Sequence, residues 1–91
     1  MEDTNEICNE LQKLNQAAQM AREDFYLKAR TLADEVVRNK NNIGDIRNVI
    51  AGLIREYEEA NERYTKAVDE ATAVCQRLTK CLSEELYGGA K

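Results

Sequence analysis

The stretch of sequence that decides the fold reads RNKNNIGD and covers residues 38–45. It holds three asparagines and a glycine within six residues, between two long segments rich in helix-favouring residues. Asparagine side chains compete for backbone hydrogen bonds, and glycine costs about 1 kcal/mol relative to alanine inside a helix. We therefore expect the chain to reverse over about residues 39–42, with Asn42 capping the helix that follows and Asp45 three residues later as a short capping box.

Upstream of this stretch, apolar residues recur at alternating steps of three and four, with one double step of four at Phe25. This spacing indicates one continuous apolar stripe along a helix over about residues 4–38, capped by Asp3 or Thr4. The stripe consists of Ile7, Leu11, Leu14, Ala18, Ala21, Phe25, Ala29, Leu32 and Val36.

Downstream, an unbroken alternation of three and four predicts a second helix over about residues 43–87, followed by a flexible tail at 88–91. Its stripe consists of Ile43, Ile46, Ile50, Leu53, Tyr57, Ala60, Tyr64, Ala67, Ala71, Val74, Leu78 and Cys81. Four further apolar residues widen the stripe on one side: Ile54, Val68, Cys75 and Leu82. A widened stripe is typical of a helical bundle rather than of a two-stranded coiled coil.

These patterns predict an all-α fold, in which residues 1–91 form a single helical domain built as an antiparallel, coiled-coil-like two-helix hairpin that assembles into a bundle. Reversal at residues 39–42 would set Phe25 opposite Tyr57 and Ile7 opposite Val74, so that large and small side chains alternate across the contact. The alternative is one continuous helix in a parallel coiled-coil dimer, because a heptad pattern also runs through residues 32–57. That arrangement would place Arg22 in a buried layer of like charges, which is costly.

In the hairpin with this pairing, the second helix extends beyond the first and leaves apolar residues without an internal partner. Exposed apolar surface of this kind usually marks a contact with another chain. We therefore predict an interface formed by Val74, Leu78, Cys81, Leu82 and Leu86.

Composition points away from several classes of function. The 91 residues carry 13 basic and 17 acidic side chains, so the net charge is −4, and no basic face emerges that would suit nucleic acid. The sequence lacks a long apolar run and a signal peptide, and we expect an intracellular, soluble protein in the cytoplasm or nucleus, without membrane insertion.

Candidate chemistry is sparse as well. The chain contains no histidine, which removes the commonest general base and metal ligand, and no glycine-rich phosphate loop. We expect no enzymatic activity, no small-molecule substrate, no cofactor and no bound metal. The predicted pairing brings Cys8 near Cys75, so a disulfide is conceivable in an oxidising compartment, but three cysteines in a chain of this composition favour reduced thiols.

The sequence thus predicts a structural or interaction protein: a helical-hairpin subunit or scaffold that pairs with itself or with other helical chains by burying apolar helix faces. The alternative is a monomeric regulatory adaptor that captures an amphipathic helix of a partner between its two helices.

Overall fold

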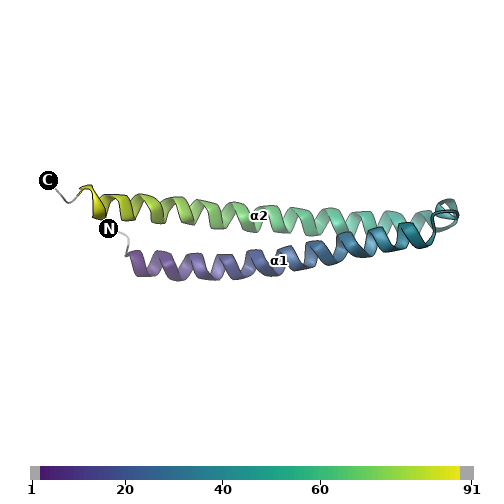
Figure 1. The fold of residues 1–91 in the computed structure, drawn as a ribbon, viewed down its shortest axis with the longest axis horizontal. Helices are drawn as coiled ribbons and strands as arrows, with labels where there is room; N and C mark the ends of the chain where they lie inside the picture. Colours follow the sequence, from purple (N-terminus) through teal and green to yellow (C-terminus); the bar gives the residue numbers. More distant parts are fainter. Residues whose placement is uncertain (1–2, 89–91) are drawn as a thin grey trace.

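The computed structural model describes residues 3–88, and it consists of two long helices joined by a short connection. Helix α1 covers Thr4–Arg38, the 3₁₀ helix η1 covers Ile43–Ile46, and α2 covers Arg47–Leu86. The two long helices run antiparallel and side by side, with the start of α1 and the end of α2 at the same end of the molecule (Figure 1). The molecule measures 70 × 18 × 15 Å. The prediction of an all-helical chain with two helices is confirmed, whereas the predicted tail falls, apart from Gly88, outside the described residues.

The ends of α1 follow from local hydrogen bonds. At the start, an Asp3 side-chain oxygen accepts a hydrogen bond from the Asn5 backbone N–H at 3.0 Å, which satisfies one of the unpaired donors of the first turn. At the end, the Asn39 backbone N–H donates to the Glu35 carbonyl at 3.1 Å. The Asn39 side-chain amide also donates to that carbonyl at 2.9 Å and to the Glu35 carboxylate at 3.0 Å. Asn39 therefore ends the first helix, as the sequence suggested.

The connection differs from the prediction in how the second helix begins. The segment Ile43–Ile46 forms a 3₁₀ helix instead of the first turn of α2, and Asn42 makes no side-chain capping hydrogen bond. The reversal is held by backbone bonds instead, from the Asn42 N–H to the Asn39 carbonyl at 2.8 Å and from the Asp45 N–H to the Asn42 carbonyl at 3.0 Å. The change of direction therefore takes residues 39–46, about one helical turn more than expected.

The two predicted stripes form the contact between α1 and α2. Buried side chains occur at four stripe positions, Ile7, Ala60, Ala71 and Val74, with exposed fractions of 8% or less. The other stripe residues are half-buried except at the turn, where Val36 and Ile43 are both 37% exposed. The helical spacing in the sequence therefore identified the contact surface, and the low number of buried residues follows from the shape, because two helices alone cannot enclose a wide core.

The longer connection shifts the register between the helices. Phe25 does contact Tyr57, with ring centroids 5.2 Å apart, but it also lies 5.8 Å from Tyr64. The predicted pairing would place Glu10 opposite Thr72, whereas Glu10 instead accepts a hydrogen bond from Arg77, five positions further along α2 (77 against 72). The predicted register is wrong by about one turn, because η1 uses four residues that the sequence interpretation assigned to α2.

Candidate functional site

The predicted interface residues at the end of α2 lie in three different environments. Val74 is only 5% exposed and belongs to the core, whereas Leu78 and Cys81 are half-buried. Leu82 and Leu86 are 38% and 67% exposed. Val74, which the predicted pairing set opposite Ile7, is buried, and the expectation that Cys81 lacks an internal partner is wrong, because Cys81 contacts Thr4 of α1. An interface at this end remains a prediction, and only the outward-facing leucines are accessible for it.

The N-terminus of α1 covers part of the expected overhang. The Thr4 hydroxyl lies 3.4 Å from the Cys81 sulfur and donates a hydrogen bond to the Glu85 carboxylate at 2.9 Å. Both contacts join the first turn of α1 to the last turns of α2. Polar side chains therefore hold these two segments together in addition to the apolar stripe.

One long side of the hairpin is charged, and we call it the ionic face, defined by Glu10, Asp24, Arg63 and Arg77. Arg63 donates to Asp24 at 3.0 Å and Arg77 donates to Glu10 at 2.7 Å. The two acids and the two arginines are each fourteen residues apart, so one register satisfies both pairs. Exposed pairs of this kind contribute less than about 1 kcal/mol each. Their main effect is to fix the register and to make this side costly to bury.

From residue 56 to residue 84, the same side of α2 carries a charge at every seventh residue. This row consists of Glu56, Arg63, Glu70, Arg77 and Glu84. Seven residues make nearly two turns of helix, so the five side chains lie along one line. A partner that packed here would have to remove several charges from water, which is unfavourable unless each is paired.

The opposite side of α2 has no charge in the equivalent row between residues 54 and 82, and we call it the apolar face. This part of the row consists of Ile54, Asn61, Val68, Cys75 and Leu82, and Arg47 precedes it at the start of α2. Val68 lies nine residues from Arg77, and nine residues make two and a half turns, which places the two rows on opposite sides of α2. Ile54, Val68 and Leu82 are 41%, 38% and 38% exposed. They are the residues that widen the second apolar stripe in the sequence, and α1 leaves them partly uncovered.

At mid-length, the apolar face carries an aromatic cluster with one cation. Phe25 lies 5.2–5.8 Å from the rings of Tyr26, Tyr57 and Tyr64. The Arg22 guanidinium carbon lies 5.1 Å from the Tyr26 ring centroid, in a cation–π arrangement. The pKa of Arg22 is raised above its ordinary value, first by hydrogen bonding to Tyr26 and then by the electrostatic effects of Tyr26 and Tyr64. Like any arginine, it is positively charged at neutral pH.

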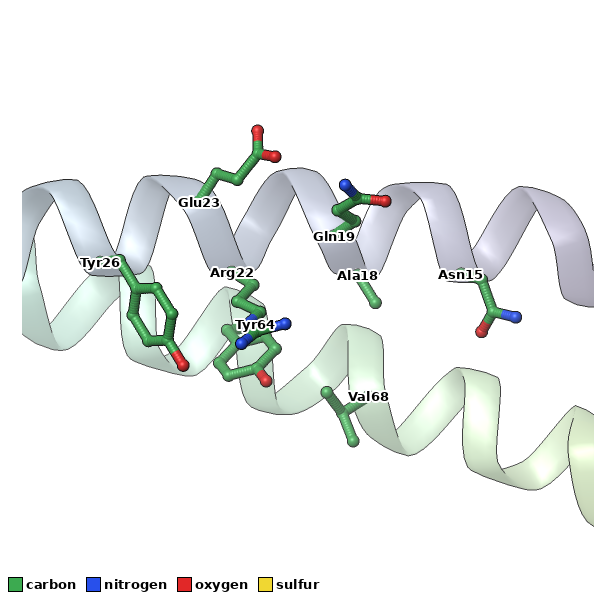
Figure 2. Close-up of a pocket in the computed structure, with 8 residues that line it drawn as sticks. All are labelled: Asn15, Ala18, Gln19, Arg22, Glu23, Tyr26, Tyr64 and Val68. Atoms are coloured by element: carbon green, nitrogen blue, oxygen red, sulfur yellow. The ribbon is translucent and has the colours of Figure 1, made fainter.

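Arg22, Tyr26 and Tyr64 border an open groove of about 530 Å³ between the helices. Figure 2 shows the Tyr26 ring and the Arg22 side chain extending from α1 toward α2, where Tyr64 and Val68 lie, while Glu23 points away from α2. Asn15 and Gln19 complete the groove on the α1 side. Its lining combines aromatic rings, neutral amides, small apolar side chains, one cation and, at its rim, the carboxylate of Glu23. These groups suit the packing of a helix surface against the groove.

Sequence reasoning missed Arg22 and Tyr26 as members of a site. It placed Tyr57 and Tyr64 correctly on the apolar stripe, and both are half-buried in the contact between the helices. Tyr26 lies outside that stripe and is 52% exposed. The spacing of four between Arg22 and Tyr26 was the available signal, because residues four apart lie next to each other on a helix.

The cysteines do not form the bridge that the sequence pairing allowed. Cys8 and Cys75 are exposed free thiols, and no disulfide occurs in the described part of the chain. Cys8 borders a surface depression with Leu11 and Gln12, whereas Cys75 borders a separate one with Thr72. The register shift moves Cys8 away from the level of Cys75 along the hairpin. The register at this end is shown instead by the contact between Thr4 and Cys81.

Two further observations concern residues 3–88. Neither helix contains a stretch long and apolar enough to cross a membrane. No group of three or more histidine, cysteine, aspartate or glutamate side chains in these residues is placed to hold a metal ion.

In comparisons with known proteins, no protein-family model, no curated protein and no solved structure gave a significant match to the chain.

Proposed function

We propose that this protein is a non-enzymatic structural subunit, a helical hairpin that buries its apolar face against helices of a neighbouring chain in a larger assembly. The observation that carries the proposal is the contrast between the two rows on α2. Between residues 54 and 82 the row through Val68 is uncharged and contains three partly exposed aliphatic residues, whereas between residues 56 and 84 every position of the row through Arg77 is charged.

The composition of the apolar face supports this function. The central parts of protein–protein interfaces are poor in charged residues and enriched in aromatic residues and arginine. The apolar face has the same character, because Tyr26 and Arg22 line the same groove as Val68. Removing the exposed aliphatic side chains from water against another helix would stabilise the assembly by about 25 cal/mol per Å² of buried apolar area.

The thin core is a second reason to expect a partner. Among the described residues, only four side chains are buried, in a molecule 70 Å long. A two-helix structure of this kind gains much of its stability from further burial in an assembly, as small domains with limited cores generally do. The hairpin would then act as a preformed half of a helical bundle, with the ionic face turned to solvent.

A second candidate is a monomeric adaptor that binds one amphipathic helix of a partner protein, and the groove at Arg22, Tyr26 and Tyr64 favours it. An apolar helix face could lie along this groove, with an acidic side chain paired to Arg22. The two candidates differ in the state of the purified chain, because an adaptor is a stable monomer and an assembly subunit associates.

The proposal is tested by photo-crosslinking in cells. A photoreactive amino acid is placed at position 68 on the apolar face or, as the matched control, at position 70 on the ionic face. We expect protein crosslinks from position 68 and few from position 70. Equal crosslinking from both positions, or none from position 68, would contradict burial of the apolar face.

A further inference from the structure

We infer that the apolar face is covered by a second copy of this chain, stacked antiparallel about a twofold axis near Val68, with α2 on α2 and α1 on α1. This inference rests on the proposed function and specifies the partner of the same face. The result is a four-helix bundle in which every neighbouring pair of helices is antiparallel.

The uncharged row has the symmetry that such a dimer requires. In a twofold interface, each residue contacts the symmetry-related position of the other copy. If Val68 meets its own copy, Ile54 meets Leu82 and Asn61 meets Cys75, because these residues lie at equal distances on either side of Val68. The large aliphatic ends therefore pack on each other, and the two smaller residues share a layer.

The same twofold axis places the Arg22 guanidinium of α1 in a polar environment. Asp24 and Arg63 are at one level of the hairpin, so Val68 lies near the level of Gln19. The axis then brings Arg22 close to Asn15 and Gln19 of the other copy, whose amide oxygens can accept its hydrogen bonds. The positions of the two Arg22 residues are about six residues apart along the direction of the helices, or roughly 9 Å at 1.5 Å per residue.

Parallel stacking is less favourable on the same grounds. A twofold axis along the hairpin would lay α1 of one copy over α2 of the other. Arg22 would then face Val68 and Asn61 instead of the amides of α1. Burying a guanidinium against an aliphatic side chain without enough acceptors is costly. The antiparallel arrangement sets aliphatic residues against aliphatic residues and polar against polar.

The size of the face is sufficient for a stable dimer. The molecule is 70 Å long and 15–18 Å wide, and the axis near Val68 leaves most of this length overlapped. A face of these dimensions offers roughly 1,000 Å² per copy, compared with about 800 Å² per partner in an interface of standard size. Between Ile54 and Leu82, the row on α2 also brings no like charges together across the axis.

The experiment combines mass measurement with directed disulfides on the purified full chain. Light scattering of the reduced protein should give twice the 10.4 kDa mass of one chain. In a background with Cys8, Cys75 and Cys81 changed to Ser, Val68→Cys should oxidise to a covalent dimer. Asn61→Cys with Cys75 retained should also give a covalent dimer, through a bond between position 61 of one copy and Cys75 of the other.

The matched controls carry only one of the two cysteines. Asn61→Cys alone, or Cys75 alone, should not crosslink, because like positions are fourteen residues apart in the antiparallel dimer, about 21 Å at 1.5 Å per residue, which is beyond disulfide reach. Circular dichroism of the reduced variants checks that each remains helical.

The outcomes separate this inference from the proposed function. Covalent dimers from Asn61→Cys alone would overturn the antiparallel arrangement. A mass of one chain, together with no dimer from Val68→Cys, would overturn the second copy as partner. If position 68 still crosslinks to a different protein in cells, the proposed function stands without the homodimer. If it crosslinks to no protein, both fail.

Discussion

The half of the hairpin near the chain ends and the half near the turn are packed differently. All four buried residues lie in the terminal half, residues 3–25 and 60–88. The turn half, residues 26–59, contains no buried side chain, and several of its aliphatic residues are substantially exposed, with Val37 at 70% and Val49 at 54%. The segment that decides the topology is therefore distant from the residues that contribute most to the core.

This difference separates two roles that are often combined in a small protein. The turn at residues 39–46 brings the helices together through backbone hydrogen bonds and makes few apolar contacts of its own. The terminal half contributes the buried contacts, the ion pair of Glu10 with Arg77 and the contacts of Thr4. Local unfolding should therefore begin in the turn half, where burial is lowest.

The largest expected effect comes from a covalent link across the terminal end. Thr4→Cys should form a disulfide with Cys81 when Cys8 and Cys75 are changed to Ser, because Thr4 Oγ1 and Cys81 Sγ are 3.4 Å apart. Closing so long a loop stabilises the folded state by about 4 kcal/mol in the chain-entropy description. Urea unfolding of the oxidised and reduced forms measures this difference.

A second cysteine pair tests the register of the same end. Thr4→Cys with Leu78→Cys, in a background with Cys81 changed to Ser, represents the pairing expected for a four-residue turn. We expect this pair to oxidise more slowly than the pair with Cys81. Faster oxidation of the 4–78 pair would show that the helices are shifted back by about one turn.

Truncation of core residues tests the contrast between the halves directly. Ile7→Ala in the terminal half should cost about 2–4 kcal/mol, because Ile7 is 1% exposed and its removal leaves a cavity. Ile50→Ala in the turn half should cost about half as much, because Ile50 is half-buried and already in contact with water. Denaturation midpoints at one protein concentration check both values, and equal losses would mean that the halves are equally well packed.

A substitution at Gly52 should stabilise the turn half without adding a contact. Gly52 lies inside α2, and a Cβ atom there would meet nothing within 4 Å. Gly52→Ala should therefore raise stability by about 1 kcal/mol through helix propensity alone. The matched control is Ala51→Gly at the exposed neighbouring position, which should lower stability by a similar amount. A loss of stability in Gly52→Ala would reveal a contact that requires glycine.

The smallest expected effect concerns the ion pair near the boundary between the halves. Arg63 and Asp24 are 58% and 37% exposed, so a double-mutant cycle with Arg63→Ala and Asp24→Ala should give a coupling of about 0.2–1 kcal/mol. The coupling should decrease in about 1 M salt, where the screening length falls to about 3 Å. A coupling well above 1 kcal/mol that is insensitive to salt would assign this pair a larger share of stability than its exposure allows.

Sequence patterns predicted the helices and their contact surfaces because both depend on local rules. The spacing of three and four that marks Ile7, Ala60, Ala71 and Val74 is a property of the helix itself, and so is the aliphatic edge through Val68. The start of α2 was predicted four residues too early, because Ile43–Ile46 has an apolar pattern compatible with either an α-helix or a 3₁₀ helix.

The candidate site could be predicted only in part. Sequence spacing identified Ile54, Val68, Cys75 and Leu82 as an extra apolar edge, but it could not show which side of the hairpin they share with Arg22 and Tyr26. That relation depends on how α1 and α2 rotate and slide against each other. The shift caused by η1 also moved Cys81 into contact with α1, and it removed part of the overhang that the sequence suggested.

The sequence by itself determined that this chain forms two amphipathic helices, where each begins and ends within a few residues, and which face of each is apolar. These properties arise between residues three or four positions apart, within one turn of helix. Only the tertiary structure decided the register, the pairing of Glu10 with Arg77 and Asp24 with Arg63, and the division of the hairpin into an ionic and an apolar face. Those features join residues 39 and 67 positions apart, whose relative placement depends on the length and conformation of the turn.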